Sequence, residues 1–370
     1  MTTSQPGADP ADSVYTLLTG DEDARACREI PEDACREQPR NFILQVVAMA
    51  TTATGDWLSS PKLVLAWLLT HTGAPAYMLG LLVPIRESLS LLPQLFIAGA
   101  IRKVAVRKWF WVAGSVAQGL MVALIAVAVT ALQGDIAGWT VLGLLVVFSL
   151  ARGVCSVASK DVLGKTIAKT RRGAVSGYAA SAAGAIVVAV GIAGLLPGTG
   201  ERDIDFYVLM LSAAALLWLL GAAVYSLLEE FPGATDGGSN AIQEAIAQLA
   251  LIRDDLQLRR FVIVRTLLIS TALVGPFYVS LMSSASDGTL AGLGALMIAA
   301  GAASFVSAPV WGRMSDRSSR LVMVYAAVLA TVTGITTFLV ASFAGQRAGL
   351  WWFPIAYFLL SVAHAGVRLG

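Results

Sequence analysis

Long stretches of the chain contain no Asp, Glu, Lys or Arg, and they restrict its possible folds more than any other feature. Among them are residues 109–134, 173–200, 206–228, 266–286, 288–312 and 321–346. An α-helix needs about 20 apolar residues to cross the hydrocarbon core of a bilayer, and each stretch reaches that length. Buried helices of soluble proteins are usually shorter. We therefore predict an all-α integral membrane protein that crosses the bilayer many times.

The composition supports this prediction and excludes several classes of function. Of the 370 residues, 56% are hydrophobic and 14% charged, whereas soluble domains contain about 25% charged residues. The net charge of +2 predicts no nucleic-acid surface. Cys27 and Cys35, interpreted as free thiols, lack CxxC spacing, and no HExxH, GxSxG or nucleotide-binding loop is present. We expect no enzyme activity, catalytic residues, metal or cofactor.

Ten helical spans are predicted, because only helices satisfy every backbone group within such segments. They cover about 46–71, 76–99, 109–132, 138–158, 174–196, 206–228, 261–284, 289–311, 321–343 and 350–367. The first 41 residues are polar and acidic and have no apolar segment typical of a signal peptide. We interpret residues 1–41 as a cytosolic N-terminal tail.

Lys and Arg are concentrated in alternate loops, which predicts the orientation of the chain. The loops assigned to the inside contain Arg102, Lys103, Arg107, Lys108, Lys160, Lys165, Lys169, Arg171, Arg172, Arg253, Arg259, Arg260, Arg313, Arg317 and Arg320. The outer loops contain only Arg202 and Arg347, plus Lys62 if the first helix ends early. The protein is therefore expected in the cytoplasmic (inner) membrane, with its N-terminus on the cytosolic side.

Residues 229–260 differ from the rest and suggest a division into domains. A polar, Gly-rich segment precedes an amphipathic stripe of apolar residues, which comprises Ile242, Ile246, Leu249, Ile252 and Leu256. We expect this helix either on the inner membrane surface or packed on other inner loops. The predicted domains are the tail, an N-terminal six-helix bundle (42–228), a cytosolic linker (229–260) and an incomplete C-terminal bundle (261–370).

An internal repeat connects the two predicted bundles. Gly99 to Arg107 follow the second span, and Gly312 to Arg320 follow the eighth, 213 residues later. Parallel repeats of this kind are typical of two-bundle transporters. The second copy, with Gly312, Asp316, Arg317 and Arg320, resembles the Gly-x-x-x-Asp-Arg-x-x-Arg loop of the major facilitator superfamily. The first copy departs from it, because Lys103 replaces the acidic residue.

The resemblance covers the whole membrane part and implies two pseudo-symmetric bundles of twelve helices in total, with alternating access to a central cavity. Ten spans are present here. The repeat offset, applied to Leu228, places the end of a twelfth helix near position 441, so about 70 residues are expected beyond Gly370 and we predict a C-terminally truncated chain. The gating residues implied by the resemblance are Gly99, Arg107, Gly312, Asp316, Arg317 and Arg320.

Arg86 and Glu87 lie about halfway along the second span, where ionisable residues are costly and therefore candidates for function. Adjacent helix positions diverge by about 100°, so the two side chains are expected to have different partners. Glu87 is the preferred proton-coupling carboxylate, and Arg86 could hold an anionic substrate. The alternative is structural ion pairing between helices.

Asp56 and Lys62 flank Pro61 in the first span. A broken helix there would expose backbone groups to a ligand. The alternative is that the helix ends near Trp57 and places both residues in an outer loop. The repeat favours the intramembrane interpretation, because the seventh span maps onto about residues 48–71.

Two further residues complete the substrate and coupling candidates, namely Arg152 in the fourth span and His364 in the tenth. The setting of Arg152 is weakly similar to that of the helix-four arginine of proton antiporters. His364 could titrate near neutral pH or be structural. A separate pattern concerns helix packing. Glycines spaced by seven residues, Gly177, Gly184 and Gly191, predict a face of small residues that allows close contact with another helix.

The function predicted from the sequence is a monomeric secondary transporter that moves a small-molecule substrate by alternating access, with a proton as coupling ion and the lipid bilayer as its environment. One alternative is a membrane sensor or scaffold that keeps the fold without transporting. The other is an inactive fragment.

Overall fold

The computed structural model describes residues 14–16, 32–91, 94–193, 195, 203–233, 235, 253–287, 289–343 and 345–369. All regular secondary structure in these residues is helical. The helices are α2 (Glu32–Arg36), α3 (Gln38–Leu58), α4 (Val64–His71), α5 (Ala76–Leu91), α6 (Gln94–Arg102), α7 (Lys108–Ala131), α8 (Gly134–Thr166), α9 (Lys169–Ala193), α10 (Asp203–Ser226), α12 (Leu256–Ile269), the 3-10 helix η2 (Ser270–Val274), α13 (Gly275–Ala285), α14 (Leu290–Arg317), α15 (Ser319–Phe343) and α16 (Gly345–Leu369). The predicted amphipathic linker helix falls mostly outside the described residues.

Seven helical segments among the described residues are long and apolar enough to cross a membrane, so the chain is a multi-pass membrane protein. They are Lys108–Ala131, Gly134–Thr166, Arg171–Ala193, Asp205–Ser226, Leu256–Ala285, Ser319–Phe343 and Gly349–Arg368, and a shorter apolar helix covers Ala291–Ser307. The first predicted span is not one continuous helix, because it divides into α3 and α4. The count of ten spans therefore stays a prediction.

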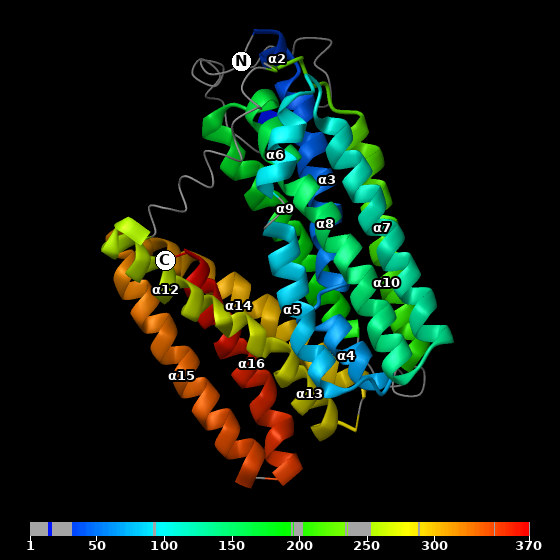
Figure 1. The fold of residues 1–370 in the computed structure, drawn as a ribbon, viewed down its shortest axis with the longest axis vertical. Helices are drawn as coiled ribbons and strands as arrows, with labels where there is room; N and C mark the ends of the chain where they lie inside the picture. The colour runs from blue at the N-terminus through cyan, green and yellow to red at the C-terminus, as the bar shows by residue number, and fades with distance from the viewer. Residues whose placement is uncertain are drawn as a thin grey trace, which may run out of the picture.

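The helices pack in two groups, which Figure 1 shows inclined to each other. In the first group α3, α7, α8 and α10 run along one another, with α9 on α3 and α5 on α8. In the second group α16 packs on α13, α14 and α15. The groups meet where α4 and α5 contact α13 and where α9 contacts α14. Residues far apart in the sequence therefore adjoin along the α4, α5 and α13 contact.

Helix α4 is the most deeply buried element at this junction. Every residue from Val64 to Leu69 is buried, and the Trp67 side chain is fully enclosed. By contrast, large apolar side chains such as Leu209, Ile335 and Phe343 are exposed. Exposed apolar side chains of this size suit contact with lipid, because hydrocarbon is the solvent around a membrane helix. Apolar side chains are thus found both buried and exposed in this protein. The burial of α4 at the junction therefore results from its packing against other helices.

Close approach of α3 and α10 depends on Gly221. A Cβ atom placed there would lie 2.7 Å from Thr52 Cγ2, 2.8 Å from Thr51 Oγ1 and 3.2 Å from the Ala48 carbonyl oxygen. Small residues let membrane helices pack with their backbones close together. The position therefore has no room for a larger side chain.

We expect Gly221→Leu to destabilise the fold by about 2 kcal/mol, because overpacking forces the two helices apart. The measurement is thermal unfolding of the purified protein in detergent. Gly143→Leu is the matched control, because a Cβ at Gly143 meets no atom within 4 Å. Equal loss of stability in both variants would contradict this account of the α3–α10 contact.

The predicted small-residue face of α9 is in helix contact at one of its three glycines. A Cβ at Gly191 would lie 3.1 Å from Ile298 Cγ1 and 3.3 Å from the Gly294 carbonyl oxygen, both on α14. At Gly177 and Gly184 it would meet nothing within 4 Å. The close packing expected from the spacing is therefore present only at the end of α9 that meets α14.

The described part of the N-terminal tail contacts the first group of helices. Tyr15 is buried with its ring centroid 5.3 Å from that of Phe42, and Gln38 Nε2 donates a hydrogen bond of 2.7 Å to Tyr15 Oη. Cys35 forms a disulfide, so the interpretation of a free thiol there is wrong. That interpretation rested on the reducing cytosol, where the tail was expected to lie. A disulfide also depends on how close two cysteines lie in the fold, which the expected compartment does not indicate.

Candidate functional site: a charged cluster at the break between α3 and α4

The sequence breaks the first span at Pro61. Pro61 has no N–H to donate and disfavours helical geometry at the residue before it. The chain leaves α3 after Leu58, where the backbone N–H of Ser59 and its hydroxyl both donate to the Gly55 carbonyl oxygen, at 3.0 and 2.8 Å. The chain is therefore interrupted between α3 and α4, and the intramembrane position of Asp56 and Lys62 stays a prediction. Asp56 lies in the last turn of α3, and Lys62 lies in the break.

Asp56 binds two arginines from two other helices. Its Oδ1 atom accepts hydrogen bonds from Nη2 of Arg86 on α5 and from Nη1 of Arg152 on α8, the latter at 2.8 Å. The guanidinium carbon of Arg86 lies 5.1 Å from the centroid of the Phe148 ring, a cation–π distance. The Arg86 side chain is 8% exposed and that of Arg152 is 36% exposed. Arg86 is thus fixed, and Arg152 is the more accessible of the two.

Lys62 connects the first group of helices to the second. Its Nζ atom lies 3.5 Å from Glu87 Oε1 on α5 and 3.4 Å from Nε2 of His364 on α16. An ammonium group can only donate, so Nε2 of His364 accepts from it. Nδ1 then carries the imidazole proton and donates to Thr271 Oγ1 at 3.2 Å, while the Thr271 hydroxyl donates to the Leu268 carbonyl oxygen at 2.8 Å. The hydrogen-bond network therefore assigns a neutral His364.

All six substrate and coupling candidates from the sequence come together in this charged cluster: Asp56, Lys62, Arg86, Glu87, Arg152 and His364. Arg86 and Glu87 take different partners, as their helical offset predicts. Lys62 also lies within electrostatic range of Asp56, so the Asp56 and Lys62 contacts form one charged system. The sequence did not identify Thr271, Phe148 or Arg368. Thr271 and Phe148 carry no charge, and Arg368 stands at the end of a span, where arginines are common.

The first copy of the repeat loop forms a second charged cluster, at the opposite end of α5 and α8 from the helix junction. Nη1 of Arg107 donates to Asp161 Oδ1 at 2.5 Å, and Lys165 Nζ lies 3.2 Å from Asp161 Oδ2 and 2.9 Å from Glu230 Oε1. The fully buried Glu230 carboxylate also accepts from the backbone N–H groups of Arg107 and Lys108 at 2.6–2.9 Å. A carboxylate is favourable there, because it meets the N-terminus of α7.

Arg107 therefore has an acidic partner although Lys103 occupies the acidic position of the repeat. Asp161 on α8 supplies that charge, and neither it nor Glu230 was identified from the sequence. For three other predicted gating residues the structure gives a position in a helix and no contact that bears on gating. Gly99 lies in α6, Gly312 lies in α14, and Arg320 is exposed in the first turn of α15. The side chains of Asp316 and Arg317 are outside the described part of the structure.

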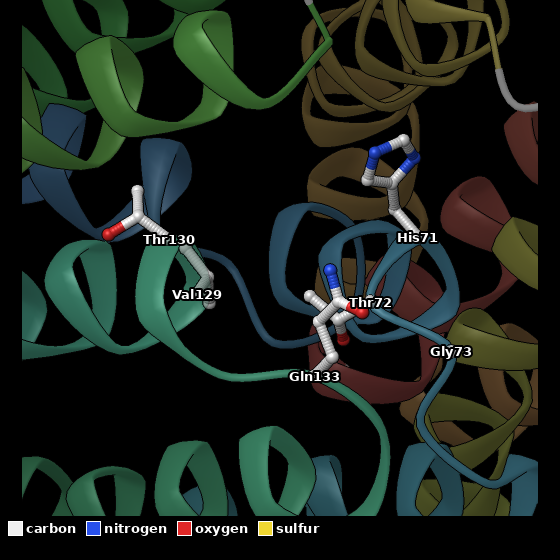
Figure 2. Close-up of a pocket in the computed structure, with 6 residues that line it drawn as sticks. All are labelled: His71, Thr72, Gly73, Val129, Thr130 and Gln133. Atoms are coloured by element: carbon white, nitrogen blue, oxygen red, sulfur yellow. The ribbon is translucent and has the colours of Figure 1, made fainter.

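Two pockets lie away from the charged cluster. One, of about 340 Å³, is lined by His71, Thr72, Gly73, Val129, Thr130 and Gln133, and Figure 2 shows His71 and Thr130 on opposite sides of Gln133. Another, of about 320 Å³, includes Gln94, Arg102, Arg107 and Asp161. Among the described residues no group of His, Cys, Asp and Glu could hold a metal ion. Neither pocket contains any of the six candidates, so the charged cluster remains the better candidate site.

Comparison with known proteins finds no matching family model and no matching curated protein. Solved structures do match. The nucleoside transporter NupG aligns with a TM-score of 0.63 at 12% identity, covering 89% of this chain and 80% of that one. A D-xylose-proton symporter aligns with a TM-score of 0.61 at 14% identity, covering 87% and 80%. The inward open xylose transporter XylE from E. coli gives 0.58 at 13% identity, covering 88% and 80%.

Identities this low show a shared fold alone. The fold of this chain is therefore similar to that of a nucleoside transporter and two xylose transporters, which agrees with the fold expected from the repeat loop. A helical membrane fold of this type thus surrounds the charged cluster.

Proposed function

We propose that this chain is a secondary active transporter that moves a small solute across the cytoplasmic membrane by alternating access, coupled to protons. The observation that carries the proposal is the charged cluster, which joins the α3–α4 break, α5 and α8 to α16 of the other helix group. Ionisable groups within membrane spans typically mark substrate and ion pathways. The printed names of the matched structures, a nucleoside transporter and a D-xylose-proton symporter, agree with this function.

The packing between the helix groups supports alternating access. Near Gly191 and Gly294 the α9–α14 contact is tight, whereas a Cβ atom added at Gly177 or Gly184, earlier in α9, would meet no atom within 4 Å. Among these glycines of α9, the one at its C-terminal end is packed against α14, and the two earlier ones adjoin open space. We propose that one helix group rocks on the other about this contact. Such rigid-body rocking is the usual form of alternating access.

Lys62 is positioned to couple a proton to this motion. Its partners are Glu87 within its own helix group and His364 in the other. When Glu87 is ionised it attracts Lys62, and when it is protonated that attraction disappears and the contact with His364 dominates. A proton on Glu87 thus changes the balance of contacts between the two groups. We assign Glu87 as the coupling carboxylate and Asp56, Lys62, Arg86, Arg152 and His364 as substrate or coupling residues.

The repeat loops are proposed to form the inner gate. Arg107, held by Asp161, belongs to the first copy, and Gly99 begins it. Gly312, Asp316, Arg317 and Arg320 form the second copy. With the N-terminus in the cytosol, as the distribution of Lys and Arg favours, both copies lie on the cytosolic side.

We expect Asp316→Asn to slow transport about tenfold without loss of folded protein, because one charged contact of the gate is worth about one such factor. The measurement is the initial rate of uptake, normalised to the amount of protein in the membrane. Arg320→Gln, in the same loop, tests whether the effect extends to its exposed end. Wild-type rates in a well-expressed Asp316→Asn variant would contradict the gating assignment.

The direct test of the function uses full-length protein in proteoliposomes under an imposed proton gradient. Radiolabelled candidate solutes of neutral and charged classes are offered, and accumulation is followed with and without a protonophore. Accumulation that the protonophore abolishes supports proton-coupled transport. No flux of any solute would favour a sensor or scaffold with a transporter fold.

A further inference from the structure

We propose that the charged cluster binds a solute carrying an oxyanion group, a carboxylate or a phosphate, through Arg86 and Arg152. The inference rests on the proposed function only in treating this bound solute as the transported one. Binding itself is tested separately from flux.

The charge of the cluster is the first argument. Among the described residues, Lys62, Arg86 and Arg152 form ion pairs with two carboxylates, Asp56 and Glu87. The hydrogen bonds of His364 assign it as neutral, and Arg368 is exposed at the end of α16, outside the cluster. Three cations against two carboxylates leave an excess of one positive charge. Uncompensated charge within a membrane protein is costly, so an anion would be stabilised there.

The unused donors of the two arginines are the second argument. A guanidinium has five N–H donors in a planar fork. In the part of the chain that the structure describes, Arg86 and Arg152 each donate one hydrogen bond to another side chain, and both bonds go to Asp56 Oδ1. Nε of Arg86 is buried without a hydrogen-bond partner. Asp56 therefore orients the two guanidiniums, and most of their donors have no hydrogen-bond partner among the described residues; those of Arg152 are the more exposed.

The geometry of these donors selects the ligand class. Guanidinium forks match the spacing of two oxygens on a carboxylate or phosphate and bind them bidentately. The Phe148 ring, 5.1 Å from the Arg86 guanidinium carbon, holds one fork in place. The 36% exposure of Arg152 leaves the other fork reachable. A neutral hydroxyl-rich solute could use some of these donors but would not offset the excess charge.

The experiment measures binding to the purified full chain in lipid nanodiscs by isothermal titration calorimetry. The probes are matched pairs that differ in charge, L-lactate with L-lactamide and glucose 6-phosphate with glucose, together with inorganic phosphate. We expect the charged member of at least one pair to bind about tenfold or more tightly than the neutral one, because charge-assisted hydrogen bonds contribute most of that affinity. The pair that responds identifies carboxylate or phosphate as the source of the oxyanion. Equal affinity within both pairs, or binding of the neutral members alone, would overturn the inference.

Substitutions at Arg152 place the binding at the cluster, because Arg152 is more exposed than Arg86 and its loss is less damaging to the fold. Arg152→Gln should weaken oxyanion binding about tenfold, and Arg152→Lys, which keeps the charge without the fork, should fall between Gln and wild type. Arg259→Gln, at an exposed position on α12, is the control and should bind as wild type does. Unchanged oxyanion affinity in a folded Arg152→Gln variant would overturn the assignment.

Uptake assays on the same preparations separate this inference from the proposed function. Oxyanion binding without flux of any solute would support the inference and count against transport. Proton-driven flux of a neutral solute, with no oxyanion binding, would support transport and overturn the inference.

Discussion

Glu87→Gln is expected to abolish accumulation of solute driven by a proton gradient while preserving solute exchange across the membrane. Gln keeps the size of the side chain but cannot release or take up a proton, so the attraction to Lys62 across 3.5 Å is permanently lost. The variant imitates the protonated transporter in its contact with His364. Accumulation should fall at least about tenfold, because a general acid–base group contributes factors of that order or larger. The measurement compares gradient-driven uptake with counterflow in proteoliposomes.

Glu229→Gln is the matched control for Glu87→Gln. Glu229 is a half-exposed carboxylate that lies 3.9 Å from Arg40, outside the charged cluster. The Glu229→Gln variant should accumulate solute as the wild type does. Accumulation retained in Glu87→Gln would move the coupling site elsewhere in the cluster, with Asp56 as the next residue to test. Loss of both accumulation and counterflow would instead show that Glu87 is required for solute movement itself.

Asp56→Asn is expected to have the largest effect on stability of any single substitution in the charged cluster. It removes the carboxylate that pairs with both Arg86 and Arg152. Because the Arg86 side chain is only 8% exposed, a charged guanidinium would remain buried without its counter-ion. Breaking a buried ion pair in this way costs about 3 kcal/mol or more. Thermal unfolding in detergent measures the loss, with Asp135→Asn at the exposed start of α8 as the control.

A second substitution distinguishes loss of charge balance from loss of shape. Adding Arg86→Gln to Asp56→Asn removes the unpaired buried cation, so the double variant should be more stable than Asp56→Asn alone. The two substitutions are in contact and should be strongly non-additive, by about 1 kcal/mol or more. Additive losses would show that the Asp56–Arg86 pair contributes little and that the stability effect has another cause.

Several features of the site follow from local sequence. Pro61 has no N–H to donate and disfavours a helical residue before it, so a break between α3 and α4 could be proposed from the sequence, although Pro84 and Pro354 lie within continuous helices. Arg86 and Glu87 diverge because successive positions on any helix differ by about 100°. The sequence did not predict that the six candidates cluster. Their contact requires Lys62, in the break after α3, to meet His364 on α16, 302 residues later.

Other features could not be predicted from the sequence. Asp161 and Glu230 are ordinary acidic residues near helix ends, and only the packing of α7, α8 and the segment after α10 brings them to Arg107 and Lys108. Thr271 becomes informative only because its hydroxyl meets Nδ1 of His364, the ring nitrogen opposite the one that faces Lys62. The disulfide of Cys35 likewise contradicted an interpretation based on compartment.

The sequence by itself determined that this chain is a helical membrane protein with the repeat loop of a large transporter fold. The physical reason is that the bilayer acts on each segment separately, because every charged residue and every unpaired backbone group is penalised within its own span. Only the tertiary structure decided which charges are partners. That choice depends on the rotation and spacing of helices, which close contacts such as Gly221 against Thr52 set between segments far apart in the chain.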